Sequence, residues 1–392
     1  MPDTNVFPLL RLGRLELDQE LRAFKPGPAA SDLVVTAMVE VPESGSEVQD
    51  AWDVAWSDAA REAAELGADQ RTAQALAAGA GDPLAAGTRM FAGAVRAVVA
   101  VQGEVLLARW LPTGTGTNSV RVGPLPHLQE AAAAAARRPA HIVVSAERHA
   151  AAIFVHAAAD HYLARRVTVG APPGEPRDPR PDRPPAHHHG RRHEGDSEPE
   201  SGGERNAEYI AARVSEAAAS VGAHIVLGAG DEHILAAVSG HLPGALGPIT
   251  TIASGPVPAD SDDQLSARIG AALDGITGEA IAAVADLVAS SAVGPAPAAV
   301  RGIEAVAQQL AEQQVAVLLV AADISRDSAG ASYRIGQRPT EFLVGDSAAG
   351  TQVPLEDGLV WAALHQDAIV VQVPDRSGPL DGQPTAALLR RR

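Results

Sequence analysis

The residues best suited to recognition lie in one polar stretch near the middle of the chain, PPAHHHGRRHEGDSEPESGGERNAEYIAARV at residues 184–214. Over residues 177–193, five arginines against two aspartates leave a net charge of +3, before any histidine is protonated. Arginine forks pair with phosphate oxygens, and histidine and arginine planes stack on unpaired bases, so this composition is typical of an RNA-binding segment. The candidate RNA-binding residues are Arg183, His187, His188, His189, Arg191, Arg192, His193 and Arg205.

Two other interpretations of this stretch stay open. A segment rich in proline and charge is typical of a solvated linker that binds nothing. Consecutive histidines can also hold Zn²⁺ or Ni²⁺, but adjacent positions on an extended chain point in alternate directions, and no second ligand cluster follows at a fixed spacing. We therefore expect no physiological metal site, and we interpret the acidic run at residues 194–200 as a solvated spacer.

No arrangement of residues elsewhere in the sequence supports a catalytic centre. Asp231, Glu232 and His233 follow a predicted strand, but an aspartate that caps a helix, with a glutamate in its first turn, explains the same pattern. No serine lies in a nucleophile elbow, and GAGDEH lacks the glycine spacing of a dinucleotide-binding loop. Lys25 is the chain's one lysine, and no Walker motif contains it. We expect no catalytic residue, no cofactor and no small-molecule substrate.

Strands and helices on both sides of the polar stretch must position it. Before it, HIVVSA, AAIFVHAA and YLARRVTVG predict three successive strands from residue 140. After it, apolar spacing predicts a helix over residues 205–221 and a buried strand at 224–230. Residues 171–204 are too polar to bury, so they predict a long mobile loop between these elements.

The two ends of the chain have patterns of their own. The first segment predicts a short helix over LLRLGRLELDQELRAF, a strand at 33–41, a helix at 46–66 with Ser46 as its N-cap, and a hairpin that turns at Gln102-Gly103. The last segment predicts long helices followed by two apolar strands, VAVLLVAAD and AIVVQVPD, of the kind buried on both faces of a sheet. The patterns predict an α/β fold class (α+β multidomain) with three domains, at residues 1–138, 139–274 and 275–392.

Four stretches carry a resemblance to a known family, namely AHIVVSAERHAAAIFVHAAADHYLARRVTVG, NAEYIAARVSEAAASVGAHIVLGAGDEHILAAVSGHLPG, ITGEAIAAVADLVASSAVGPAPAAVRGIEAVAQQLAEQQVAVLLVAADI and LVWAALHQDAIVVQVPDRSGPLDG. Their order resembles the archaeo-eukaryotic release factor and Pelota family, and more closely its bacterial branch with the actinobacterial Balon-type hibernation factors. The resemblance implies an N-terminal mixed α/β domain and a middle RNase H-like domain that carries the long loop. It also implies a C-terminal α/β/α sandwich similar to kink-turn RNA-binding ribosomal proteins.

The same resemblance implies a place on the ribosome. In the family, the middle-domain loop reaches the peptidyl-transferase centre, and release factors carry Gly-Gly-Gln at its tip. This chain lacks that triplet, because its one double glycine, Gly202-Gly203, is followed by Glu204. We therefore expect a non-catalytic hibernation factor that occupies the A site of bacterial ribosomes under stress or dormancy.

The partners implied are ribosomal RNA of both subunits, ribosomal proteins near the stalk base, and elongation factor Tu. Two alternatives stay open. One is a peptidyl-tRNA hydrolase or ribosome rescue factor with a degenerate loop, and the other is a stress-linked scaffold that never binds ribosomes.

Composition limits the remaining classes of function. A net charge of −17 argues against nonspecific binding to nucleic acid or to anionic lipid, so contact with RNA requires a local basic patch. The absence of cysteine excludes disulfides, thiol catalysis and thiolate-ligated metals. The sequence has no run of eighteen apolar residues, and its first residues lack the basic-then-apolar plan of a signal peptide, so we expect a cytoplasmic protein that does not enter membranes.

Overall fold

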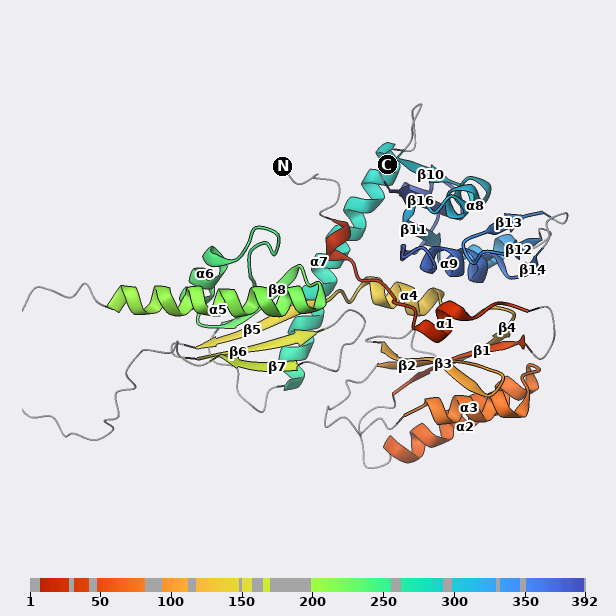
Figure 1. The fold of residues 1–392 in the computed structure, drawn as a ribbon, viewed down its shortest axis with the longest axis horizontal. Coiled ribbons are helices and arrows are strands. Elements are labelled where there is room, and N and C mark those ends of the chain that lie inside the picture. The colour runs from red at the N-terminus through yellow and green to blue at the C-terminus, as the bar shows by residue number, and fades with distance from the viewer. Residues whose placement is uncertain are drawn as a thin grey trace, which may run out of the picture. The chain divides into compact units, whose positions relative to one another are not determined.

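Residue contacts divide the chain into two units, each described here by itself (Figure 1). The first unit takes its residues from 1–139 and 273–392, and the second from 140–156 and 164–272. The computed structural model describes residues 8–27, 32–41, 48–81, 94–111, 118–147, 150–156, 165–169, 199–254, 262–291, 298–328, 332–345 and 350–390. Because the first and last predicted domains share one unit, the division into three domains stays a prediction.

The second unit contains a five-stranded mixed sheet in the order β7-β6-β5-β8-β9. The three strands predicted from residue 140 are confirmed as antiparallel neighbours, β5 (His141–Glu147), β6 (Ala150–His156) and β7 (Arg165–Val169). β8 (Ile225–Gly230) pairs in parallel with β5, and β9 (Thr250–Ser254) pairs in parallel with β8. Strands and helices alternate in this part of the chain, as an α/β fold requires.

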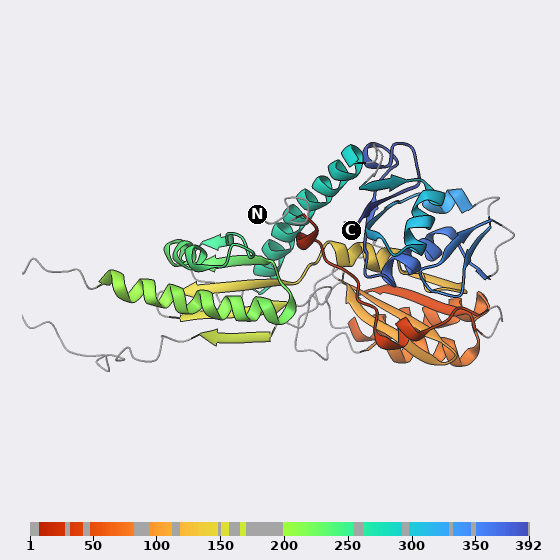
Figure 2. The same ribbon diagram turned by 45° about the horizontal axis from the view of Figure 1, so that its top comes forward.

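Helices α5 (Pro199–Val221) and α6 (Glu232–His241) complete the second unit. α5 contacts β5, β6 and α6 through a stripe at helical spacing, made of Ala207, Ile210, Ala211, Val214, Ala217 and Ala218. The helix begins six residues before the predicted start at residue 205, so residues 199–204, which were predicted to belong to the loop, are helical. Both ribbon views show its N-terminal end projecting past the strands of the sheet (Figures 1 and 2).

The first unit opens with an antiparallel sheet in the order β3-β2-β1-β4. Its strands are β1 (Val34–Glu40), β2 (Val95–Val101), β3 (Glu104–Leu111) and β4 (Ser119–Gly123). The predicted hairpin turn is confirmed, since Gln102 and Gly103 have φ angles of +53° and +83°. Helices α2 (Val48–Glu65) and α3 (Gln70–Gly79) cover one face, where Trp52 and Trp56 are buried. Ser46, the predicted N-cap, lies outside the described residues.

The last segment of the chain supplies a second sheet to the first unit, in the order β10-β16-β11-β15. β11 (Val315–Ala321) and β15 (Ile369–Val373) are parallel, and β16 (Thr385–Leu389) runs antiparallel between β11 and β10 (Ala299–Arg301). The C-terminal half of α7 (Asp262–Ser291) packs on one side of this sheet. Helices α8 (Ile303–Ala311) and α9 (Leu355–Leu364) pack on the other side, so both faces are covered, as predicted.

A small three-stranded sheet also belongs to the last segment. Its strands are β12 (Tyr333–Ile335), β13 (Phe342–Val344) and β14 (Thr351–Gln352), and β12 lies between the other two. Tyr333 and Phe342 from this sheet are buried in the same cluster as α8 and α9. No helix in the described ranges has the length and apolar character needed to cross a bilayer.

One hydrophobic core joins the first and last segments of the chain. It combines Leu15, Met38 and Leu125 with α9, and α4 (Gln129–Ala136) contacts β15. The helix predicted over residues 9–24 is wrong: a 3-10 turn, η1 (Leu9–Arg11), and α1 (Gln19–Ala23) flank an extended segment. The close approach of this segment to α4 explains the difference, because a Cβ at Gly13 would lie 2.0 Å from the carbonyl oxygen of Ala135.

A buried ionisable pair also joins the two segments within this core. The Nδ1 atom of His127 lies 2.7 Å from Oδ1 of Asp357, and the backbone N–H of His127 donates to Thr36 Oγ1. Burial alone lowers the pKa of His127, but the hydrogen bond and the charge of Asp357 outweigh it and raise that pKa. Burial raises the pKa of Asp357 by more than His127 lowers it. The folded chain therefore holds a proton on this pair more tightly than the unfolded chain does.

Candidate nucleic-acid interface

Most of the predicted RNA-binding residues lie outside the described residues. Arg183, His187, His188, His189, Arg191, Arg192 and His193 belong to the stretch between the end of β7 and the start of α5. Arg205 is described, and its side chain is exposed near the start of α5. The proposed roles of these residues therefore stay predictions.

The two glycines assigned to the end of the predicted degenerate loop lie in a helix. Gly202 and Gly203 have helical backbone near the N-terminal end of α5, and the exposed Glu204 follows them. Among the side chains described in this helix, the first buried one is Ala207, one turn further on. A glycine inside a helix costs about 1 kcal/mol relative to alanine, so this end of α5 is intrinsically weak.

Both ends of the stretch that carries the predicted loop attach at the same end of the second unit's sheet. β7 ends at Val169, which pairs with Ala151 beside the turn between β5 and β6. α5 leads into β8 at the opposite end of the sheet, where Ile225 pairs with His141, so the start of α5 points back toward the β5–β6 turn. Val169 and Pro199, the described residues on either side of positions 170–198, therefore both lie toward this end of the sheet.

The strand-to-helix turn after β8 lies at that same end. Gly230 has a φ of +122°, and a Cβ there would lie 2.0 Å from the carbonyl oxygen of Ala146. The next residue confirms the predicted cap, since the carboxylate of Asp231 accepts hydrogen bonds from the backbone N–H groups of His233 and Ile234. Glu232 accepts a hydrogen bond from the Ser254 hydroxyl at 2.5 Å. Both carboxylates are thus occupied in stabilising the turn.

A stacked histidine pair occupies the opposite end of the sheet. His141 and His156 are direct partners across β5 and β6, and both are buried. Their ring centroids are 4.4 Å apart, and their planes are inclined by only 5°. These rings lie at the end of the sheet opposite the turn between β5 and β6. Among the described residues, no group of histidines and carboxylates is arranged to hold a metal ion.

Charged residues that follow β11 make contacts within the last segment of the chain. Asp323 accepts a hydrogen bond from Arg376 Nε at 3.0 Å and lies 3.6 Å from Arg326. Arg334 donates to the carbonyl of Gly350 at 3.0 Å. These contacts favour the interpretation of this group as surface charge.

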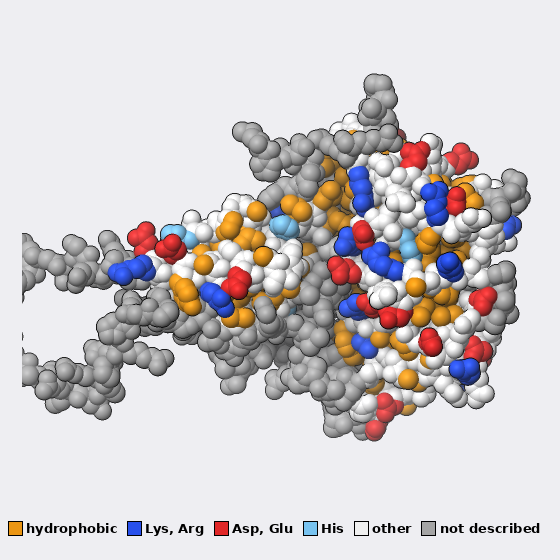
Figure 3. Space-filling view, in the orientation of Figure 1, with side chains coloured by type: hydrophobic (Ala, Val, Ile, Leu, Met, Phe, Trp, Pro, Cys, Tyr) orange, Lys and Arg blue, Asp and Glu red, His pale blue; other side chains and the backbone are white. Residues whose placement is uncertain are grey.

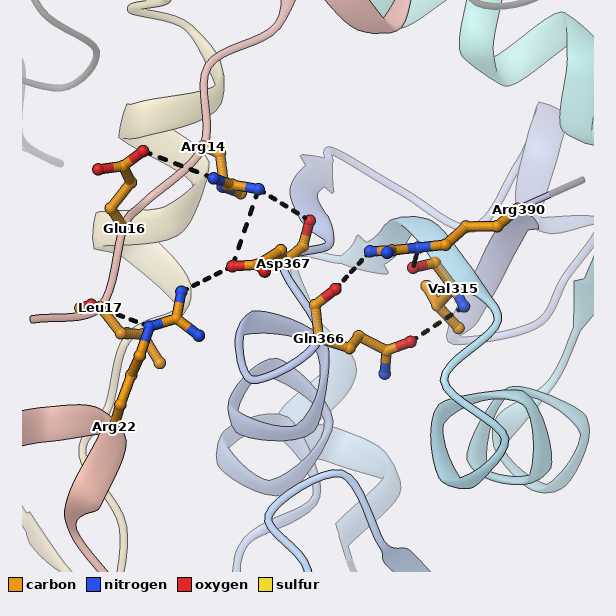
Figure 4. Close-up of polar contacts among 8 residues, drawn as sticks. All are labelled: Arg14, Glu16, Leu17, Arg22, Val315, Gln366, Asp367 and Arg390. Atoms are coloured by element: carbon orange, nitrogen blue, oxygen red, sulfur yellow. Dashed lines mark hydrogen bonds and ion pairs between the residues drawn. The ribbon is translucent and has the colours of Figure 1, made fainter. Parts of the chain in front are cut away.

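A cluster of arginines in the first unit was not predicted from the sequence. On the face shown in Figure 3, basic side chains gather among acidic ones over the segment between η1 and α1 and over α4. Here Arg14, Arg22 and Arg390 surround Asp367, and we call these four residues the Asp367 cluster (Figure 4). Arg14 and Arg22 precede Asp367 by 353 and 345 residues, and Arg390 follows a different strand, β16. No spacing in the sequence could therefore have revealed the cluster.

Comparisons with known proteins identify the part of the chain that carries the loop. The model of "Bacterial archaeo-eukaryotic release factor family 2" matches residues 132–292, a range that includes the whole second unit. No curated protein matches the sequence.

Three solved structures match most of the chain at low identity. Pelota from Archaeoglobus fulgidus is 14% identical, covers 78% of this chain and 81% of its own, and has a TM-score of 0.34. The archaeal translation termination factor aRF1 is 13% identical over 95% of this chain and 96% of its own, with a TM-score of 0.23. Archaeal Pelota bound to the ribosome with ABCE1 is 14% identical over 76% of this chain and 78% of its own, with a TM-score of 0.36.

At these TM-scores the solved structures carry no argument, so the assignment rests on the family match. That match covers two of the four stretches that carry the resemblance in the sequence, at residues 140–170 and 206–244, and the beginning of a third. Residues 132–292 of the chain are similar to the bacterial archaeo-eukaryotic release factor family.

Proposed function

We propose that the protein is a ribosome-binding factor of the Balon type, which occupies the A site of bacterial ribosomes and blocks translation during stress or dormancy. In this proposal it catalyses no reaction. The observation that carries the proposal is the sequence Gly202-Gly203-Glu204 within α5, in a chain whose second unit matches the release factor family but which contains no Gly-Gly-Gln.

The chemistry of peptide release supports this choice. Hydrolysis of peptidyl-tRNA requires a backbone that approaches the ester bond closely and a side chain that positions water. A helical glycine pair followed by an anionic glutamate offers neither, because the carboxylate would meet a site crowded with phosphates. Binding without release is the activity that remains.

The charge distribution supports a ribosomal partner only where positive charge is concentrated. The net charge of −17 disfavours a large contact with RNA, whereas the +3 segment at residues 177–193 suits it. The acidic remainder of the surface suits basic ribosomal proteins near the stalk base. Delivery by elongation factor Tu and a cytoplasmic location complete the proposal.

Sedimentation and peptide release test the proposal together. The purified protein should comigrate with 70S ribosomes in a sucrose gradient, and it should release no peptide from ribosomes that carry a model peptidyl-tRNA. Glu204→Gln restores the Gly-Gly-Gln triplet in the sequence, and we expect that this variant also binds without release because the triplet lies in a helix. Glu208→Gln, at an exposed position one turn along α5, is the matched control.

The results contradict the proposal in two ways. Peptide release by the unchanged protein would instead support the hydrolase or rescue factor. Failure to comigrate with ribosomes at any ionic strength would support a scaffold that never binds them.

A further inference from the structure

We propose that the Asp367 cluster is a phosphate-binding surface that contacts the backbone of ribosomal RNA, separately from the segment at residues 177–193. The inference rests on the proposed function, because that function supplies RNA as the partner. It adds a contact in the first unit that the sequence did not predict.

Asp367 occupies a position where folding alone does not favour a carboxylate. It follows α9 with a φ of +59°, a left-handed conformation that glycine or asparagine adopts most easily. Its N–H donates to the carbonyl of Leu364, and Ala368 N–H donates to Ala363, which closes the end of the helix. A negative charge at a helix C-terminus is also disfavoured by the helix dipole. The carboxylate must therefore be stabilised by groups outside α9.

Three guanidinium groups from distant parts of the chain supply that stabilisation (Figure 4). Arg22 donates to Oδ1 of Asp367 at 2.6 Å, and Arg14 Nη1 lies 3.8 Å from the same oxygen. Arg390 is held beside them by hydrogen bonds to the carbonyls of Val315 and Gln366. Burial alone raises the pKa of Asp367, but the hydrogen bond from Arg22 and the charges of all three arginines outweigh it and lower that pKa.

The cluster is held in place and yet open to solvent. The side chains of Arg14 and Arg22 are each 38% exposed, and that of Asp367 is 46% exposed. Arg22 uses Nε to donate to the carbonyl of Leu17, so two of its donor groups are fixed by the protein itself. A guanidinium has five N–H donors, which leaves others for a ligand. The protein thus holds the arginines in position before a ligand arrives.

The charge of the cluster fits a polyanion. Three arginines against Asp367 and Glu16, which lies 3.5 Å from Arg14, leave a net charge of +1. Two guanidiniums already converge on a single carboxylate oxygen, and a phosphate oxygen accepts the same planar donors.

Binding of the full-length protein to a 20-base-pair RNA duplex, measured by fluorescence anisotropy between 50 and 200 mM salt, tests the inference. Arg14→Gln and Arg22→Gln should each weaken binding, and each should remove about 0.9 from the slope of log K against log salt. The ratio of wild-type to variant affinity should therefore shrink about 3.5-fold across this range. Arg61→Gln is the matched control, because Arg61 is an exposed arginine on α2 that pairs with Asp58 and Glu65.

Asp367→Asn separates RNA binding from a purely structural role. Asparagine tolerates the left-handed conformation and removes a competing anion, so this variant should bind the duplex more tightly than wild type. If the cluster only held the fold together, Asp367→Asn would weaken binding or leave it unchanged. Tryptophan fluorescence of each variant checks folding of the first unit, and Asp367→Asn still decides the matter if an arginine variant unfolds.

Two further comparisons identify the ligand and separate this inference from the proposed function. Anionic lipid vesicles should not bind in a way that depends on Arg14 or Arg22, and such dependence would overturn the assignment to RNA. If wild type and all the variants comigrate equally with 70S ribosomes while duplex binding is also unchanged, the inference fails and the proposed function stands. If the duplex results are as expected but wild type never comigrates with ribosomes, the proposed function fails instead.

Discussion

Replacing the buried pair His127–Asp357 should destabilise the first unit strongly, and the effect should depend on pH. Each side chain is the main polar partner of the other in the core between β1 and α9, at a separation of 2.7 Å. Removing one member of a buried ion pair typically costs about 3–5 kcal/mol, because the other is left as an uncompensated charge. We expect this cost for His127→Leu and for Asp357→Leu. At roughly 3 kcal/mol per M of urea, the unfolding midpoint should fall by about 1–1.7 M.

The double variant should recover most of the lost stability. Replacing a buried pair with apolar residues of similar volume is often neutral or stabilising, so the two single costs should not add. All four tryptophans of the chain, Trp52, Trp56, Trp110 and Trp361, lie in the first unit. Tryptophan fluorescence in urea therefore reports the unfolding of this unit alone.

The pH dependence follows from the raised pKa of each partner. A group whose pKa is raised by folding contributes its full stabilisation when the pH is below the pKa of the group in the unfolded chain, which is near 6.5 for histidine. That contribution is lost as the pH rises through the pKa of the group in the folded protein. The stability of wild type should therefore fall, relative to the double variant, by at most about 1.4 kcal/mol per pH unit for each proton that the pair loses. Parallel stability curves for the two proteins from pH 5 to 9 would refute the reasoning, as would a double variant no more stable than the single variants.

Three more substitutions test contacts elsewhere in the protein. Burial lowers the pKa of His365, so the contribution of this residue to stability should be lost as pH falls below about 6.5. His365→Leu should therefore flatten the acid side of the curve of stability, measured in urea, against pH. A steeper loss of stability at acid pH in this variant would contradict this. Gly230→Ala should destabilise the second unit by roughly 1–3 kcal/mol because Gly230 has a positive φ, and the effect should appear as faster amide exchange in β8. Gly240→Ala is the control, since a Cβ at Gly240 would meet open space, and it should not speed exchange in β8. Asp231→Ala should cost about 1 kcal/mol and speed exchange at the start of α6, and Asp231→Ser should restore most of the protection.

The features that the sequence predicted well depend on near neighbours. The turn at Gln102-Gly103 requires positive φ angles, and a cap such as Asp231 needs only the two or three residues that follow it. The first two strands from residue 140, β5 and β6, could be recognised because each is largely apolar. These signals are complete within a few positions, so the sequence is sufficient to read them.

The features that were missed depend on distant parts of the chain. β16 is central in its sheet, but its sequence TAALL is too short and alanine-rich to identify without β10 and β11 on either side. The helix predicted over residues 9–24 was wrong because contact with α4 overrides local propensity.

The candidate site likewise has one part that could be predicted from near neighbours and one part that depends on distant residues. Local composition at residues 177–193 predicted an RNA-binding segment, whereas the partners of Asp367 could not be predicted because Arg14 and Arg22 precede it by 353 and 345 residues. The fold brings these side chains together, and only the folded chain identifies them as a cluster.

The division of the first unit between the two ends of the chain has a consequence for biosynthesis. A nascent chain that has reached residue 139 has made β1 to β4 and α4, but the helix that covers Leu15, Met38 and Leu125 lies beyond residue 350. At 5–20 residues per second, translation of residues 140–272 alone takes roughly 7–27 s, during which the second unit can fold while that apolar surface stays uncovered. The amino-terminal third is therefore the part of the nascent protein that most needs a chaperone, and a fragment that stops at residue 139 should aggregate when it is produced alone.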